Sequence, residues 1–264
     1  MSTYSPFSAK QLLPQEEKLE IAKHKSELFI GIPKETSYQE RRICLTPDAV
    51  SSLVNHGHRV MVECGAGKNA SFSDKDYSDA GAEVTHDTKK IFSCPIILKV
   101  EPPTLEEIDM MNMEAILISA IQLKTQKKEY FEAITKKKIT SLAFEFIKDS
   151  DGSYPAVKSL SEIAGTASVL IAAELMINNN DGKGLLFGNI TGVPPTEVVI
   201  LGAGTVAEYA VRTALSLGAN VKVFDNSITK LRRLQNTLNQ RIFTSTIHDK
   251  ALLKAIRRCD VAIG

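Results

Sequence analysis

The stretch VVILGAGTVAEYAVRTALSLGANVKVFD, from Val198 to Asp225, limits the possible folds more than any other part of the chain. It reads as an apolar strand, a Gly-Ala-Gly turn, a helix and a second apolar strand that ends in an aspartate. Strands joined through a helix pair in parallel, and parallel sheets carry helices on both faces. The stretch therefore predicts a β-α-β unit inside an α/β fold.

The glycine turn has the form GxGxxA, with Gly202, Gly204 and Ala207 at the small positions. The first glycine allows a tight turn, the second lets the backbone approach a pyrophosphate, and the alanine lets helix pack on strand. Thr205 and Val206 then fall in the first helical turn, whose free N–H groups and partial positive charge attract phosphate. The pattern predicts a dinucleotide site; the alternative is a turn that serves only packing.

Asp225 closes the second strand, where a carboxylate can accept hydrogen bonds from the 2′ and 3′ hydroxyls of a ribose. The same charge repels a 2′-phosphate, so NAD(H) is expected rather than NADP(H). The following helix carries Lys230, Arg232 and Arg233, which are either solvated or neighbours of the adenine end. We keep Lys230 as a cofactor-binding candidate.

The first half of the chain repeats the alternation of apolar runs and helical segments. A helix is expected at 46–57, because Thr46 can cap it, Pro47 suits its first turn and Gly57 stops it. The alternation predicts a largely parallel sheet covered on both faces. Its five expected strands are 28–33, 58–63, 95–100, 114–119 and 139–145.

The expected organisation is α/β, with two domains built on largely parallel sheets. A polar extension spans 1–27, a substrate domain spans 28–155, and a Rossmann-type dinucleotide-binding domain spans 156–264 and stops after its fourth strand. The turn-rich segment KDSDGSYP marks the boundary. After it, the small residues of LSEIAGTASVLIAAELMI predict a buried connecting helix.

Composition and charge exclude several classes of protein. The chain is 43% hydrophobic and 24% charged, and 32 basic residues balance 31 acidic ones, so nothing suggests nucleic acid or an anionic membrane. No stretch approaches eighteen apolar residues, and the N-terminus lacks a secretory signal, so no membrane span is expected. No metal site is expected, and the scattered cysteines indicate reduced thiols in a cytoplasm: Cys44, Cys64, Cys94 and Cys259.

Cations follow two strands of the first domain. Arg41 and Arg42 come after the strand at 28–33, and Lys99 lies near the end of the strand at 95–100. Open parallel sheets bind ligands at the carboxyl ends of their strands, and an arginine can hold a carboxylate through two hydrogen bonds. These cations are therefore ligand-binding candidates; the alternatives are a solvated lysine and a surface arginine pair.

Five ordered motifs resemble alanine dehydrogenase and the related alpha subunit of NAD(P) transhydrogenase. The resemblance runs from about residue 28 to the end, and the segments KET…E.R and EFIKD.DG.YPAV look closer to alanine dehydrogenase. The motifs are GIPKETSYQERRICLTPDAV, VECGAGKNASFSDKDYSDAGAEV, IILKVEPP, LSEIAG and VVILGAGTVAEYA.

The resemblance implies NAD-dependent oxidative deamination of L-alanine to pyruvate and ammonia, with a substrate cleft between two domains, in a cytoplasmic homo-oligomer, a hexamer. Arg42 matches the arginine that holds the substrate carboxylate, and Lys99, also the catalytic candidate, matches the lysine that reaches the carboxylate and carbonyl side. Ser161 matches a serine near the cofactor phosphates. Gly202, Gly204 and Asp225 match the dinucleotide positions.

Two departures from the family pattern stand out. Gln122 occupies a position where many alanine dehydrogenases have a histidine, and its amide cannot trade protons near neutral pH. Either Lys99 or a water then transfers the proton, or the histidine is dispensable in this branch, or catalysis is impaired. The family's catalytic aspartate and a returning segment would lie beyond Gly264, so the chain is expected to be a truncated product that lacks activity itself. The alternatives are a transhydrogenase alpha subunit with a membrane partner, or a non-catalytic NAD-binding module.

Overall fold

Two compact units make up the part of the chain that the computed structural model describes, which is residues 27–178, 182–238 and 240–264. The first unit ends at Leu142 and the second begins at Ala143. The polar extension predicted for 1–27 lies outside the described residues, apart from Glu27. Each unit has its own sheet and core.

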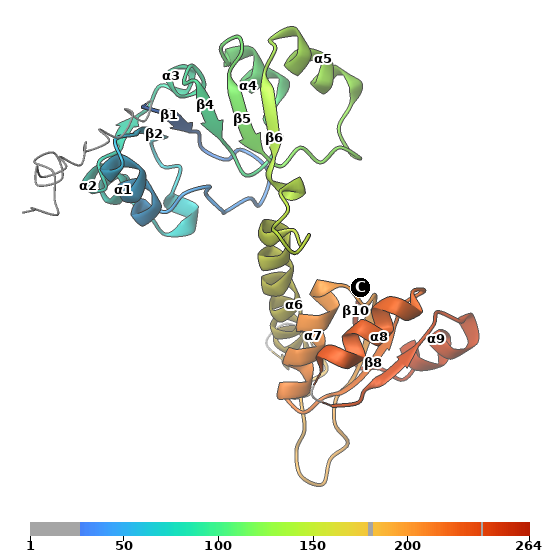
Figure 1. Cartoon of the computed structure of the whole chain (residues 1–264). Coiled ribbons are helices and arrows are strands. Elements are labelled where there is room, and N and C mark those ends of the chain that lie inside the picture. The colour runs from blue at the N-terminus through green and yellow to red at the C-terminus, as the bar shows by residue number, and fades with distance from the viewer. Residues whose placement is uncertain (1–26, 179–181, 239) are drawn as a thin grey trace, which may run out of the picture. The chain divides into compact units, whose positions relative to one another are not determined.

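The first unit is built on a six-stranded sheet in the order β3-β2-β1-β4-β5-β6 (Figure 1). β1 pairs in parallel with both β2 and β4, and the pairs β2–β3 and β4–β5 are parallel as well. The strand order reverses between β1 and β4, and open α/β sheets bind ligands at such a switch point. The strands are β1 (Phe29–Ile32), β2 (Arg59–Glu63), β3 (Glu83–Thr85), β4 (Ile96–Leu98), β5 (Ile116–Ser119) and β6 (Thr140–Ala143).

The helices of the first unit begin where the sequence has capping residues. Thr46 accepts a hydrogen bond from the N–H of Ala49, and Pro47 opens the predicted helix. Thr104 and Glu107 form a reciprocal capping box at the start of α4. The helices are α1 (Pro47–Asn55), α2 (Asp74–Asp79), α3 (Thr88–Phe92), α4 (Leu105–Met110) and α5 (Lys128–Lys136), with a 3-10 turn at Lys68–Ala70.

The sheet has one strand more than the five predicted, because β3 and the following α3 were missed. β3 is three residues long, its sequence Glu-Val-Thr has one aliphatic residue, and it lies at the sheet edge. A strand this short leaves no alternating pattern to detect. Its register against β2 is nevertheless defined, with Val84 opposite Val62.

Helices cover both faces of this sheet at β1, as expected. Ile30 and Ile32 share a core with Tyr77 of α2. Gly31 points to the opposite face, because side chains alternate along a strand. There a Cβ on Gly31 would lie 2.6 Å from the carbonyl oxygen of Ile91 in α3, so only glycine allows this close approach.

The second unit contains the four predicted strands as a parallel sheet in the order β10-β7-β8-β9. Its first strand lies between its second and fourth, which is the Rossmann order. Val198 and Ile200 pack under α7 and α8, while Val199 and Phe224 pack against Ala255 of α9. The elements are α6 (Pro155–Met176), β7 (Glu197–Leu201), α7 (Thr205–Ser216), β8 (Asn220–Phe224), α8 (Ile228–Thr237), β9 (Phe243–Ser245), α9 (Asp249–Ile256) and β10 (Val261–Ile263), preceded by a 3-10 turn at Phe144–Phe146.

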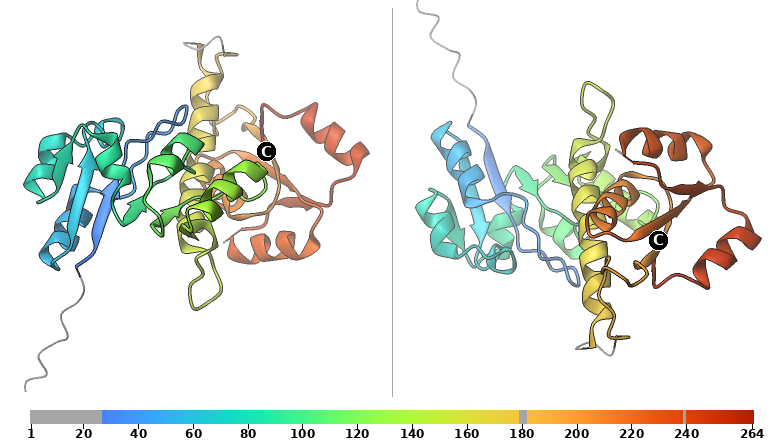
Figure 2. Two further views of the ribbon diagram at one scale, coloured as in Figure 1. Left: turned by 90° about the horizontal axis from the view of Figure 1, so that it is seen from above. Right: turned by 90° about the horizontal axis from the view of Figure 1, so that it is seen from below.

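α6 corrects one expectation, that the connecting helix is buried. It runs alongside α7 (Figure 2), and a Cβ on Gly165 would lie 2.3 Å from the carbonyl oxygen of Val206. The small residues form only this one face, however, and Ile163 and Leu175 are more than half exposed, so the helix is not buried as predicted. Of the described helices, α6 is also long and apolar enough to cross a membrane by length and composition alone, a test that core helices pass as well.

Candidate substrate and dinucleotide sites

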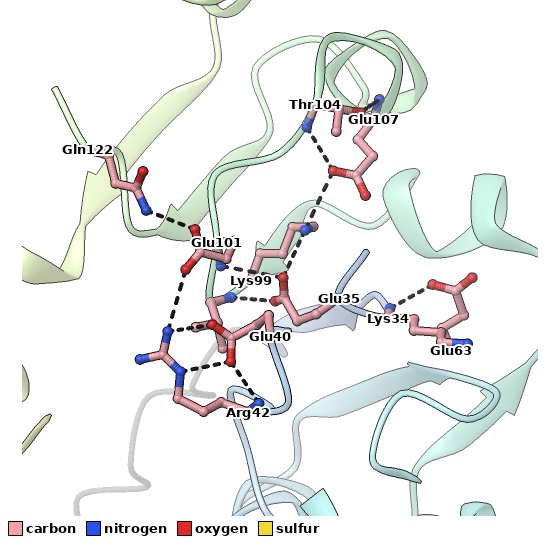
Figure 3. A network of polar contacts seen from close by, with 11 residues as sticks. Lys34, Glu35, Glu40, Arg42, Glu63, Lys99, Glu101, Thr104, Glu107 and Gln122 are labelled. Carbon is pink, nitrogen blue, oxygen red and sulfur yellow. Dashed lines mark hydrogen bonds and ion pairs between the residues drawn. The ribbon is translucent and has the colours of Figure 1, made fainter. Parts of the chain in front are cut away.

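Charged and polar side chains gather at the carboxyl ends of β1, β4 and β5, which are neighbours in the first sheet (Figure 3). The loop after β1 is tied to the strands beside it. The backbone N–H of Lys34 donates to Glu63 at the end of β2 (2.7 Å), and Glu35 accepts from the N–H of Val100 after β4 (2.6 Å). These bonds hold the loop against the switch point of the sheet.

Lys99 lies beneath this site rather than open to it. Its side chain is fully buried, with Nζ 2.9 Å from Glu35 Oε2 and 3.6 Å from Glu107 Oε2. Both carboxylates are themselves buried, and Glu107 also accepts from the N–H of Thr104 at the start of α4. The lysine therefore joins the β1 loop, β4 and α4 through one buried charge cluster.

Arg42 lies in the same loop and is held by Glu40. The guanidinium donates through Nε and Nη2 to the two oxygens of Glu40, at 2.8 and 2.5 Å. This fork raises the pKa of Arg42 and lowers the pKa of the Glu40 carboxyl. About half of the Arg42 side chain remains exposed, whereas Glu40 is buried. One edge of the guanidinium is thus occupied, and the exposed part is the part that a ligand can reach.

Glu101 connects Arg42 to Gln122. Glu101 Oε1 lies 3.5 Å from Arg42 Nη2, and Glu101 Oε2 accepts a hydrogen bond of 2.8 Å from Gln122 Nε2. The structure thus places Arg42 and Gln122 in one network through Glu101, which follows Lys99 by two residues. The sequence had indicated Arg42, Lys99 and Gln122 only as separate candidates.

Sequence reasoning assigned no role to four carboxylates of this network. The motif KET…E.R contains two of them, but its letters do not show which cation each one meets. Strand order supplies that information, because it makes the ends of β1, β4 and β5 adjacent. The four are Glu35, Glu40, Glu101 and Glu107.

The glycine turn of the second unit has the geometry that its sequence predicts. Gly202 has φ of +102°, which side chains rarely adopt, and its N–H donates to the carbonyl of Phe224 at the end of β8 (2.7 Å). A Cβ on Gly204 would meet nothing within 4 Å, so space is open in front of the backbone. Gly204 is the N-cap of α7, and Thr205 and Val206 open the helix. Their N–H groups belong to the first turn, where donors have no partner within the helix.

Asp225 at the end of β8 also stabilises the glycine turn through hydrogen bonds. Its carboxylate accepts from the N–H of Ser227 (2.6 Å) and from the N–H of Ala203 inside the turn (2.8 Å). These two hydrogen bonds, that of Ser227 first, lower the pKa of Asp225 despite its burial. The sequence did not reveal this structural role.

An open groove of about 440 Å³ lies beside the turn and is lined by Gly202, Asp225 and Lys230, among others. Ser161, predicted near the cofactor phosphates, lies in α6 one turn before Gly165 and on the same helical face. Gly165 itself packs against the first turns of α7, where its Cβ would lie 2.3 Å from the carbonyl oxygen of Val206. Within the described residues, no group of three or more His, Cys, Asp or Glu side chains could hold a metal ion.

Two α/β units, one with charged strand ends at a switch point and the other with a glycine turn in Rossmann order, define a protein of the dinucleotide-binding α/β class. Comparison with known proteins narrows this class. Residues 31–164 match the model of the alanine dehydrogenase/PNT N-terminal domain, and residues 168–264 match that of its C-terminal domain. The chain therefore belongs to the alanine dehydrogenase/PNT family.

Individual relatives agree with the family models. The chain is 34% identical to alanine dehydrogenase of Mycolicibacterium smegmatis and 33% identical to that of Methanococcus maripaludis, over 90% of its own length. It spans 64% of the length of both relatives. A solved structure titled L-alanine dehydrogenase superposes with a TM-score of 0.80 at 34% identity, covering 90% of this chain and 65% of the other. A transhydrogenase from Sinorhizobium meliloti gives 0.72 at 25% identity, covering 89% and 68%.

Proposed function

We propose that this protein catalyses the reversible NAD-dependent oxidative deamination of L-alanine to pyruvate and ammonia. The observation that carries the proposal is the placement of Arg42 at the switch point of the first sheet, in a chain whose second unit presents a glycine turn. An arginine at this position suits a small carboxylate, and the turn suits a dinucleotide. The relatives at 33–34% identity, named alanine dehydrogenases, favour the same reaction.

In the proposed reaction each unit supplies one reactant. The second unit holds NAD(H), with Gly202, Gly204, Thr205 and Val206 at the phosphates and Asp225 at the ribose. Bound NAD supplies the hydride chemistry, which belongs to the cofactor rather than to the chain. Lys230 and Ser161 complete the proposed contacts: Lys230 lines the groove beside Asp225, and Ser161 lies in α6, one turn before Gly165.

The first unit binds and polarises the substrate. Arg42 holds its carboxylate, and Lys99 stabilises negative charge that develops on the carbonyl side. To reach a substrate Lys99 exchanges a carboxylate partner for it, and the contact with Glu107, at 3.6 Å, is the looser of its two. Gln122 hydrogen-bonds without exchanging protons, so a water or Lys99 transfers the proton.

The test is NADH oxidation by the full product of the coding region, since the chain spans 64% of the length of its two alanine dehydrogenase relatives. Oxidation should require pyruvate and ammonium together. Oxidation that needs neither, or NADH binding with no turnover, would reject the proposal. The second outcome would instead favour the transhydrogenase-like alternative suggested by the Sinorhizobium meliloti structure, or a non-catalytic NAD-binding module.

We also propose that the protein acts in the cytoplasm as a homo-oligomer. Sedimentation of the purified protein tests the oligomeric part directly: a single species with the mass of one chain would reject it.

A further inference from the structure

Two carboxylates converge on one nitrogen of Arg42. Nη2 lies 2.5 Å from Glu40 Oε2 and 3.5 Å from Glu101 Oε1. Glu40 comes from the loop after β1 and Glu101 from the loop after β4, so the two carboxylates reach the guanidinium from separate strand ends (Figure 3). One arginine cannot neutralise both carboxylates, and the negative charge beside it exceeds its own.

The wider network has the same excess of negative charge. Glu35, Glu40, Glu101 and Glu107 face the two cations Lys99 and Arg42. Three of the four carboxylates are firmly engaged: Glu35 and Glu107 with Lys99 and backbone N–H groups, and Glu40 in its fork with Arg42. Surplus carboxylate charge at a partly exposed site favours a cationic ligand group.

Glu101 is the carboxylate that can meet such a group. Its side chain is 23% exposed, whereas that of Glu40 is 8% exposed, and its contact with Arg42 is the longer of the two. It accepts one good hydrogen bond, from the amide of Gln122. A carboxylate can accept about four hydrogen bonds, so Glu101 retains room for another donor.

We propose that Glu101 is the receptor for a primary ammonium group, namely the α-ammonium of an amino-acid substrate whose carboxylate binds Arg42. This inference rests on the proposed function and names the residue that distinguishes the amino acid from the 2-oxo acid. In an α-amino acid the two charged groups are separated by a single carbon atom. They therefore lie side by side, as Arg42 and Glu101 do.

Gln122 has a defined part in this arrangement, that of a positioning residue. Its amide orients the Glu101 carboxylate but brings no charge. A protonated histidine at this position would place a positive charge against Glu101 and offset the charge that attracts an ammonium. A neutral glutamine at this position is therefore suited to a site that holds the Glu101 carboxylate in place and leaves its negative charge available to an ammonium group.

The experiment measures binding of L-alanine and of propionate to the 264-residue chain by calorimetric titration. Propionate has the same carboxylate and lacks the ammonium. Glu101→Gln should weaken L-alanine binding at least tenfold and leave propionate binding unchanged or stronger, because a repelling charge is removed. Preserved propionate binding also shows that the Arg42 site is still folded. Glu106→Gln, on the exposed side of α4, is the matched control and should change neither ligand.

Gln122→Leu should weaken L-alanine binding less than Glu101→Gln does, because it disorients the carboxylate without removing it. The inference is overturned if the wild-type chain binds L-alanine no better than propionate. It is also overturned if Glu101→Gln leaves L-alanine binding intact or weakens both ligands equally.

Failure of the proposed function would look different. If only the dehydrogenase proposal is wrong, the chain still binds L-alanine more tightly than propionate in a way that depends on Glu101, but NADH oxidation does not depend on ammonium. Loss of this inference alone would appear as normal turnover with no such discrimination.

Discussion

Replacing Lys99 with methionine tests whether the charge cluster beneath β4 holds the first unit together. Lys99 Nζ lies 2.9 Å from Glu35 Oε2, and both side chains are almost completely buried. Removing one partner of a buried pair costs roughly 3–5 kcal/mol, because the other charge remains buried and unpaired. Glu35 keeps its 2.6 Å hydrogen bond from Val100, so we expect the lower end, about 3 kcal/mol.

Hydrogen exchange measures this cost locally. About 3 kcal/mol corresponds to an increase of roughly a hundredfold in the opening constant. Amides of β1 and β4 should exchange faster by that factor, while those of β7 and β8 in the second unit should not change. Hydrogen exchange reports on each unit separately, so a single unfolding transition need not be fitted to a chain with two compact units.

A matched control separates burial from charge. Lys128 Nζ also lies 2.9 Å from a carboxylate oxygen, that of Glu132, but its side chain is 85% exposed. Lys128→Met should therefore change protection very little. Glu35→Gln combined with Lys99→Met should recover part of the loss, since the unpaired charge is gone. If Lys99→Met costs no more than Lys128→Met, the cluster does not stabilise the unit as argued.

Substitutions at four further positions address the two sites. Gly204→Ala places a methyl group in open space, so stability should hold while NADH affinity in a fluorescence titration falls at least tenfold; unchanged affinity would argue against phosphate at the turn. Asp225→Ala should weaken NADH binding by roughly 1–3 kcal/mol and NADPH binding by less; equal losses would argue against the ribose contact. Because the pKa of Asp225 is lowered in the folded state, its contribution to stability is complete above its ordinary value of 3.8 and is lost as pH falls through the lower folded value. Asp225→Asn should therefore make the free energy of unfolding of the second unit depend less on pH in that range. In steady-state assays of the full-length protein, Arg42→Lys should raise KM for pyruvate and spare NADH affinity, whereas Arg41→Lys should do little. If Arg41→Lys has the larger effect, Arg41 rather than Arg42 is the residue that matches the family arginine.

The elements that sequence could predict are those whose residues carry a local signal. The helix at Pro47 has its capping residue, its proline and its acidic first turn within a few positions, and α1 begins there. The turn at Gly202 needs a positive φ that the glycine itself indicates. β3 has neither a periodic pattern nor a cap, and its strand pairing depends on β2, which sequence spacing does not reveal.

The candidate site could be predicted only in part, for a related reason. Cations after a strand suggested ligand contacts at Arg42 and Lys99. The burial of Lys99 between Glu35 and Glu107, and the bridge that Glu101 makes from Arg42 to Gln122, depend on strand order. The same limit applies to α6, where small residues identified a packing face without showing how little of the helix that face covers.

Transfer of deuterium from NADH labelled at C4 of the nicotinamide tests the central claim most directly. The full-length protein, incubated with pyruvate and ammonium, should produce L-alanine carrying deuterium at the α-carbon, and Arg42→Lys should slow the appearance of that product. Omitting ammonium should abolish it. Deuterium recovered in lactate instead, or none transferred by a protein that binds NADH, would contradict the account.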